Sequence, residues 1–478
     1  MTMIRMKMKV QLGSCAIAFL CASCATQPGT STPPVVAPAA FEQQPATAGQ
    51  AAWPEKDWYR GFASQELDSL VELAQQNNFD LAAAAARIRQ ADARARAAGA
   101  AILPQVDLNG NAVYYTGGSN GQTVDETDWS ALLSASYEID FWGKNRASSQ
   151  SAQLSALASQ AERDTLALTT LTGVANGYFQ VLSLRERLNI ARANLESTRE
   201  VLQVIEARYN AGAATAAELA TQRAAVANAE LTIAPLEQQE VEARAALALL
   251  VGHPPEGFAV NAQHLDDLSE PAVVPGLPAD LLLRRPDVLA AETNLQAAHA
   301  DVAAARAAMF PSLTLTGSGG AQNPAVQAAV ITLEGAGYQL SVGAALVQTI
   351  FDGGRRRAVR DEAQAKEEEL LANYRAAILS AFADVETALS AIRHLDTQRA
   401  AQTENVTQSE RAFEGARLRY RAGAGDYLSM LDAQRTLYTA RDQSSQYKLA
   451  RLHAAVGLFK ALGGGWQQPA RTAATPGT

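Results

Sequence analysis

Cysteine and histidine are scarce in this chain of 478 residues, and their positions exclude several kinds of protein. The three cysteines are Cys15, Cys21 and Cys24, so all of them lie in the N-terminal segment. The rest of the chain can form no disulfide, no zinc–thiolate site and no thiol nucleophile. No two histidines have the i, i+4 spacing that places two metal ligands on one helix face. We therefore expect neither a metal nor another cofactor.

Long apolar runs are missing as well. Beyond the N-terminus there is no run of 18 or more uncharged apolar residues, which excludes a bundle of membrane-spanning helices. The strands of a membrane β-barrel alternate between apolar and polar residues and give no such run, so that class stays open. The net charge of −9 makes nucleic acid a poor partner.

Catalytic motifs are also absent. The chain has neither a nucleophile elbow nor a phosphate-binding loop of the Walker type. Neighbouring acidic residues do occur, as in 367–369 and 266–267. On or beside long helices such groups are typical of a solvated face rather than of an acid/base pair. We therefore expect no enzyme activity.

The N-terminus has the pattern of an exported protein. Basic residues up to Lys9 precede a short apolar stretch, 10–20, and then small residues up to Cys24. Residues 1–23 are therefore predicted to be a signal peptide, followed by a flexible linker rich in Pro, Ala, Thr and Gln over 24–54. The tail over 466–478 has a similar composition, and we expect it to be disordered.

Cys24 is the candidate for lipid modification. The tripeptide that ends at Cys24 resembles a bacterial lipobox, in which the cysteine after the cut carries the lipid. Cys21 departs from this pattern, because it stands where the lipobox prefers leucine. Two alternatives stay open, namely lipidation at Cys15 and cleavage without lipidation. A lipid anchor with several chains would hold the mature protein to a membrane.

The chain between these ends repeats itself. Four segments of the first half recur in the same order in the second half, at a nearly constant offset of 207 to 212 residues. The matching pairs are 102–110 with 309–317, 142–147 with 353–358, 208–212 with 419–423, and 222–223 with 434–435. We therefore predict one fold built from two structural repeats.

Each predicted repeat begins with a helix, which starts near Asp80 in the first repeat and near Asp287 in the second, and continues with two strands and two long helices. The first repeat covers 55–270 and the second covers 271–465. The expected strands are about 104–115, 129–141, 311–320 and 338–350. The expected helices are about 143–210, 215–251, 353–421 and 426–462.

The predicted strands have the composition of a barrel wall. In the first strand the apolar residues Val106, Leu108 and Ala112 alternate with polar residues, and aromatic residues gather at the strand ends. Alternation and aromatic girdles are both typical of a membrane barrel with a wet lumen. A soluble hairpin with aromatic ends is the alternative interpretation.

The predicted helices over 143–210 and 353–421 contain no proline, and each would be on the order of 100 Å long. Apolar residues and alanines recur there at alternating spacings of three and four, which predicts long antiparallel helical hairpins packed side by side into a tube. A soluble coiled-coil rod is the alternative. Four strands cannot close a membrane barrel, so a membrane location would require a cyclic oligomer, either a dimer or a trimer.

Several motifs together resemble the TolC-like outer-membrane efflux protein family, in its OprM/NodT-type lipoprotein branch. The segments that carry the resemblance are 58–70, 283–292, 308–313, 350–355, 419–423 and 431–434. The similarity covers about 53–465. It departs at the weak lipobox and at Gly425, where some relatives carry a basic residue.

This resemblance implies a mainly helical trimer with a twelve-stranded membrane β-barrel and a periplasmic helical tunnel. It implies a lipid-anchored outer-membrane channel, the exit duct of a tripartite pump, that passively conducts small molecules such as drugs. The implied partners are a periplasmic adaptor and an inner-membrane transporter of the RND type. The alternative function is a structural or adhesive trimeric coiled-coil lipoprotein without transport.

The resemblance also suggests functional residues at the helical turns. Gly212 and Gly423 stand where a helix must stop and reverse, and we expect these tips to face the adaptor. Asp432 and Leu428 would form rings at a constriction of the trimer, with Tyr420 and Glu218 as the next gate candidates. The alternative for Asp432 is an ion pair with Arg435 on the helix surface.

Overall fold

The computed structural model describes residues 38–43, 53–119, 122–271, 278–322 and 337–467. All of them belong to one unit, Ala37–Thr478. The predicted signal peptide, Cys24 with its alternative Cys15, and the tail from 468 lie outside the described residues.

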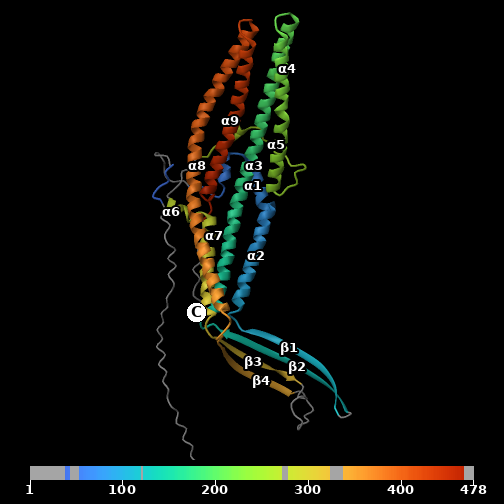
Figure 1. Cartoon of the computed structure of the whole chain (residues 1–478), viewed down its shortest axis with the longest axis vertical. Coiled ribbons are helices and arrows are strands. Elements are labelled where there is room, and N and C mark those ends of the chain that lie inside the picture. The colour runs from blue at the N-terminus through green and yellow to red at the C-terminus, as the bar shows by residue number, and fades with distance from the viewer. Residues whose placement is uncertain (1–37, 44–52, 120–121, 272–277, 323–336, 468–478) are drawn as a thin grey trace, which may run out of the picture. The chain divides into compact units, whose positions relative to one another are not determined.

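The described chain is mainly helical, with one sheet (Figure 1). In order, its elements are η1 (Trp58–Phe62), α1 (Gln65–Asn77), α2 (Phe79–Ala100), β1 (Gln105–Ser119), β2 (Gln122–Ile139), α3 (Lys144–Asn210), α4 (Ala216–Leu231), α5 (Ile233–Leu250), η2 (Leu265–Asp267), α6 (Pro278–Leu281), α7 (Pro286–Ala307), β3 (Ser312–Gln322), β4 (Gly337–Val347), α8 (Arg355–Arg421) and α9 (Tyr427–Ala461).

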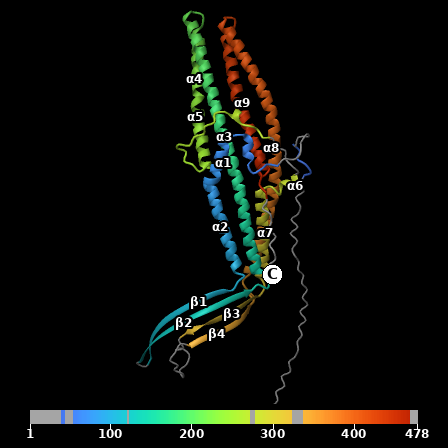
Figure 2. The ribbon, with the colours of Figure 1, turned by 180° about the vertical axis from the view of Figure 1, so that it is seen from behind.

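The two longest helices, α3 and α8, have 67 residues each. Each begins after a glycine in the left-handed region, Gly143 with φ 78° and Gly354 with φ 90°. That conformation turns the chain sharply out of the preceding strand without a Cβ clash. α3 with α4 and α5 forms one hairpin, α8 with α9 forms a second, and the two lie side by side in both views (Figures 1 and 2).

The single helix predicted over 215–251 is wrong, because the structure has two helices separated at Thr232. Pro235 supplies the reason, since proline has no N–H to donate to the carbonyl of Leu231. At the same helix end, the Thr232 hydroxyl donates to another carbonyl, that of Ala229, at 2.7 Å.

The first β-hairpin is also longer than predicted. β1 continues to Ser119 and β2 begins at Gln122, whereas the sequence suggested 104–115 and 129–141. Backbone pairing continues beyond Tyr115, from Thr116 opposite Asp125 to Ser119 opposite Gln122. This pairing satisfies the backbone N–H and carbonyl groups of the extra residues.

The four strands form one antiparallel sheet in the order β1-β2-β3-β4. Asp107 lies opposite Ser134, Ser134 opposite Ser318, and Ser318 opposite Ser341, so these four side chains share one face. Among the described residues, β1 and β4 have a partner strand on one side only. The sheet therefore has two open edges.

A buried aromatic cluster joins η1, near the start of the chain, to two of the long helices. Trp58 stacks on Phe459 with ring centroids 5.0 Å apart, and Phe62 contacts Phe179 at 5.0 Å. These rings link η1 to α3 and α9 in one apolar core. In the described part of the chain no helix has both the length and the apolar character needed to cross a membrane.

Candidate functional site

The two faces of the sheet differ sharply in chemistry. The paired strands place one set of apolar residues on the same face: Val106, Leu108, Ala112, Trp129, Leu133, Tyr137, Ile139, Leu313, Leu315, Leu340, Val342 and Leu346. Many of these are strongly exposed, for example Leu340 at 82% and Val342 at 87%. An apolar face this exposed must be covered by a partner or by lipid.

The opposite face, which we call the polar face, carries mostly amides, hydroxyls and carboxylates, with Val113, Leu132 and Val347 among its few apolar residues. The Asn109 amide donates to the Ser134 hydroxyl at 2.9 Å, and the hydroxyls of Ser318 and Ser341 lie 2.8 Å apart. The four strands contain no lysine, arginine or histidine. This face therefore suits contact with water rather than with lipid.

The turns at the two helical tips share one geometry. Gly212 has φ 74° and Gly423 has φ 73°. In the first turn the N–H of Ala213 donates to the carbonyl of Arg208 at 2.8 Å, and in the second the N–H of Ala424 donates to Arg419 at 2.9 Å. This is the Schellman arrangement, which favours glycine in the left-handed position.

The residues after each glycine start the returning helix. Thr215 caps α4 and forms a capping box with Glu218, whose carboxylate accepts the N–H of Thr215 at 2.6 Å. Asp426 caps α9 and accepts the N–H of Ser429 at 2.8 Å. Glu218, a gate candidate in the sequence, therefore holds the start of α4 in this structure.

Tyr420, another gate candidate, is buried between the two hairpins. The Arg208 guanidinium lies 4.6 Å from the centre of the Tyr420 ring and also donates to the Tyr420 carbonyl at 2.9 Å. These contacts combine a cation–π interaction with a charge-assisted hydrogen bond. They fasten the end of α3 to the end of α8.

A second set of contacts joins α4 and α3 to α9. The Tyr427 hydroxyl donates to the Gln222 side chain at 2.8 Å, and the Gln222 amide donates to the Thr198 carbonyl at 2.8 Å. The Gln434 amide reaches the Thr198 hydroxyl at 3.1 Å. Burial raises the pKa of Tyr427 to about 12, so this phenol stays a donor at physiological pH. We call Arg208, Gln222, Tyr420, Tyr427 and Gln434 the tip clasp.

The two remaining gate candidates lie on the surface of α9. Leu428 is 68% exposed, and Asp432 is exposed one helical turn further on. Among the described residues Asp432 forms no ion pair with Arg435, so that alternative interpretation does not hold in this structure. The structure thus separates the four gate candidates into two exposed residues and two that support the tips.

The sequence did not single out the members of the tip clasp other than Tyr420. Arg208 and the two glutamines nevertheless stood inside the repeated segments 208–212, 222–223 and 434–435. Their contacts cross from one hairpin to the other over more than 200 residues, for example from Arg208 to Tyr420. Sequence spacing alone carries no signal for such a contact.

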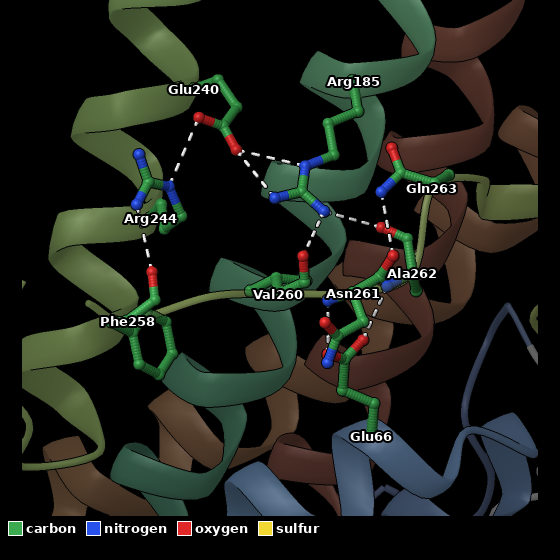
Figure 3. A network of polar contacts seen from close by, with 9 residues as sticks. All are labelled: Glu66, Arg185, Glu240, Arg244, Phe258, Val260, Asn261, Ala262 and Gln263. Carbon is green, nitrogen blue, oxygen red and sulfur yellow. Dashed lines mark hydrogen bonds and ion pairs between the residues drawn. The ribbon is translucent and has the colours of Figure 1, made fainter.

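A polar network fixes the loop that leaves the first hairpin (Figure 3). The Arg185 guanidinium donates to the carbonyls of Val260 and Ala262 at 2.6 and 2.8 Å, and it pairs with Glu240 at 3.0 Å. The Glu66 carboxylate accepts the N–H groups of Asn261 and Ala262 at 2.6 and 3.0 Å. Helices α1, α3 and α5 thus hold the loop through its backbone, which places few demands on its sequence.

No cation site is evident among the residues that the structure describes, since no three His, Cys, Asp or Glu side chains gather there. The features with functional character are therefore surfaces and turns. They are the two-faced sheet with its open edges and the paired helical tips.

Comparisons with known proteins agree with this arrangement. The chain matches the family model described as "Outer membrane efflux protein" over residues 70–253 and 277–464. It is 44% identical to the pyoverdine export outer membrane protein OpmQ of Pseudomonas putida, covering 93% of this chain and 96% of the relative. It is 47% identical to OpmQ of Pseudomonas aeruginosa, covering 86% and 88%.

Solved structures give the same result for the fold. The outer-membrane channel OprN superposes with a TM-score of 0.83 at 28% identity, covering 91% of this chain and 98% of OprN. The predicted mainly helical fold of TolC-like type is thereby confirmed. On these matches, the chain belongs to the outer membrane efflux protein family.

Proposed function

We propose that this protein is the outer-membrane exit duct of a tripartite efflux pump and that three copies close a twelve-stranded barrel. The observation that carries the proposal is the sheet register, which separates an exposed apolar face from a polar face. A barrel wall between lipid and a wet lumen requires this separation.

The dimensions of the apolar face support the barrel. Its residues on β2 run from Trp129 to Ile139, ten steps of about 3.4 Å or about 34 Å in total. With a strand tilt of about 40° this becomes about 26 Å along the barrel axis, close to the roughly 25 Å apolar band of outer-membrane barrels.

The open edges support closure by further copies. β1 and β4 lie at opposite edges and, because each of the three pairings is antiparallel, run in opposite directions. β4 of one copy can therefore pair antiparallel with β1 of the next. Two copies would give eight strands and three would give twelve, and the family membership favours three.

The two OpmQ relatives support a narrower substrate than the small molecules, such as drugs, expected from the sequence. Both are named for pyoverdine export and are 44% and 47% identical to this chain. We infer that the exported molecule is a siderophore of the pyoverdine type, which would leave through the polar lumen. Passive conduction needs no catalytic group in this chain. The energy for export would therefore come from an inner-membrane transporter of the RND type.

The remaining elements of the proposal concern anchoring and assembly. Cys24 carries the lipid that holds the N-terminus at the outer membrane. The chain consists of two repeats, 55–270 and 271–465. The tips at Gly212 and Gly423 meet the periplasmic adaptor, and Asp432 with Leu428 forms the resting constriction. The equal lengths of α3 and α8 and the matching tip geometry support the repeats.

Charged substitutions on the two sheet faces test the barrel. Leu340 and Ser341 are neighbours on β4 but belong to opposite faces. Leu340→Asp should impair outer-membrane insertion, because it places a carboxylate against lipid. Ser341→Asp, the matched control, should insert and give a three-chain band after cross-linking in detergent. Equal insertion of both variants would contradict the barrel.

Export is tested in the native host lacking this gene. Wild type should restore siderophore to the medium, and the purified trimer should conduct ions in planar bilayers. A protein that forms trimers without conductance or export would instead fit the structural coiled-coil lipoprotein.

The adaptor assignment needs a separate test. Gly423→Leu should abolish adaptor co-purification while leaving membrane insertion intact, since the left-handed turn disfavours a side chain. Gly415→Leu is the control, because Gly415 lies within α8 with no neighbour near its absent Cβ. Loss of insertion in Gly423→Leu would assign the glycine to folding instead.

A further inference from the structure

A cavity lies where the sheet meets the long helices. Its volume is about 420 Å³, within the range of small-ligand sites. Its walls come from the end of β2, the start of β3, the segment after β4, the end of α7, and the first residues of α3 and α8, with Ile139, Trp142, Phe310 and Arg355 among the lining residues. It thus adjoins the two central strands and also borders the segment that follows the edge strand β4.

Aromatic rings form one wall of the cavity and are held in place. The Trp142 indole N–H donates to the Pro311 carbonyl at 2.8 Å. Its ring stacks on Phe310 at 4.7 Å, and Phe141 contacts its edge at 4.9 Å. Even so, Trp142 remains 47% exposed and Phe310 51% exposed. This apolar wall is therefore held by contacts within the chain and is still available for contact.

The acidic residues of the cavity already have partners. Glu138 binds the Lys144 ammonium at 2.6 Å. Asp140 accepts the backbone N–H of Asn145 at 3.0 Å and pairs with the Arg146 guanidinium, which lies outside the cavity.

The arginines of the cavity differ in their contacts. The Arg356 guanidinium donates to the Ala308 carbonyl at 2.8 Å and the Thr349 hydroxyl at 2.6 Å. Asp352 in turn accepts the N–H of Arg356 at 3.1 Å. Arg355 has no ion pair or side-chain hydrogen bond with any part of the chain that the structure describes. The cavity therefore presents one free guanidinium, which favours an anion.

The cavity also continues the apolar face of the sheet. Ile139 belongs to both, because it lines the cavity and is the last apolar-face residue of β2, opposite Leu313. If that face contacts lipid, as the proposed function requires, the cavity lies at the membrane boundary. Aromatic and basic side chains concentrate at that boundary in membrane proteins.

We propose that this cavity binds the phosphate group of a membrane phospholipid. Arg355 holds the phosphate oxygens through its N–H groups, and the Trp142–Phe310 stack supports the glycerol and the first acyl carbons. A guanidinium suits this role because it stays charged and matches phosphate geometry. The proposal rests on the proposed function, since it needs the apolar face to lie in lipid.

Binding of phosphatidylglycerol to the purified trimer, measured by native mass spectrometry, tests the proposal. Arg355→Gln should weaken binding about tenfold, the effect of losing one charge-assisted hydrogen bond. Arg357→Gln is the matched control. It removes the same charge only two residues from Arg355, but the Arg357 side chain does not line the cavity. This control should change binding less than twofold.

Three outcomes would overturn the proposal. Equal losses in Arg355→Gln and Arg357→Gln would mean general attraction to anionic lipid. Equal binding of diacylglycerol, which lacks the phosphate, would remove the role of Arg355. Competition by millimolar inorganic phosphate without any lipid preference would assign the cavity to a soluble anion. Channel conductance of Arg355→Gln keeps the two proposals apart, because a conducting trimer with unchanged lipid affinity contradicts only this inference.

Discussion

Arg285 joins three helices through one guanidinium group. It binds the Asp287 carboxylate at 2.7 and 3.0 Å, the Asp384 carboxylate at 2.9 Å and the Ala461 carbonyl at 3.1 Å. Its side chain is only 9% exposed, so these contacts replace most of its hydration. The Arg-Pro-Asp sequence within 283–292 therefore has a structural reason, because it clamps α7 to α8 and α9.

The first prediction concerns the acid side of this clamp. Burial tends to raise the pKa of Asp287, but the hydrogen bonds and charge of Arg285 outweigh it and hold that pKa below the usual value. The lowered folded-state pKa means that the carboxylate stabilises the fold above about pH 4, and that this stabilisation is lost as pH falls further.

Asp287→Asn should accordingly destabilise the protein at pH 7 by about 1.5–3 kcal/mol and weaken the acid dependence of stability below pH 4. Thermal unfolding followed by circular dichroism from pH 7 to pH 2 measures both effects. Asp361→Asn removes an exposed ion pair with Arg360 and should shift stability by less than about 0.5 kcal/mol. Parallel acid profiles for wild type and Asp287→Asn would show that the clamp contributes nothing through charge.

The second prediction concerns the turn after α9. Gly463 has φ 84°, and a Cβ at this position would lie 1.9 Å from the Arg284 carbonyl oxygen. Gly463→Ala should therefore lower stability by about 2–4 kcal/mol through strain and displacement of the clamp. Gly457→Ala is the control, because Gly457 lies in α9 with open space around it and should gain up to about 1 kcal/mol. Equal melting of the two variants would rule out the steric argument.

At the scale of elements, the long helices and the tip turns could be predicted because their signals are local. Apolar spacing over 353–421 and the glycine at 423 each depend on near neighbours in the sequence. The break at Thr232 also has a local signal in the sequence, because Pro235 cannot donate a helical hydrogen bond. The contact of Arg208 with Tyr420 and the Arg185 network could not be predicted, since their partners come from distant segments.

A short N-terminal segment docks on α8 and allows the third prediction. Phe41 is 3% exposed, and the Glu386 carboxylate accepts the N–H groups of Glu42 and Gln43 at 2.5 and 3.1 Å. Glu386→Ala should raise hydrogen exchange at these two amides about tenfold, because it removes both acceptors. Glu369→Ala removes an exposed carboxylate from the same helix and should leave that exchange unchanged. Unchanged exchange in Glu386→Ala would mean that Phe41 alone holds the segment.

At the scale of the whole molecule, threefold symmetry would turn each exposed side chain of α9 into a ring of three. Leu428 and Asp432 are four residues apart, about 6 Å along the helix axis. The rings would then stack, with apolar contact in one and negative charge in the other. Together they would narrow the tunnel and favour cations at its mouth.

The last prediction follows from these rings. The double variant Leu428→Ala, Asp432→Ala should raise the resting single-channel conductance and reduce the preference for potassium over chloride. Glu414→Ala, an exposed carboxylate on α8 paired with Arg417, is the control and should alter neither property. Unchanged conductance and selectivity in the double variant would place the constriction elsewhere on the tunnel. The tip clasp at Tyr420 would then be the next place to examine, because it ties the turn of one hairpin directly to the turn of the other.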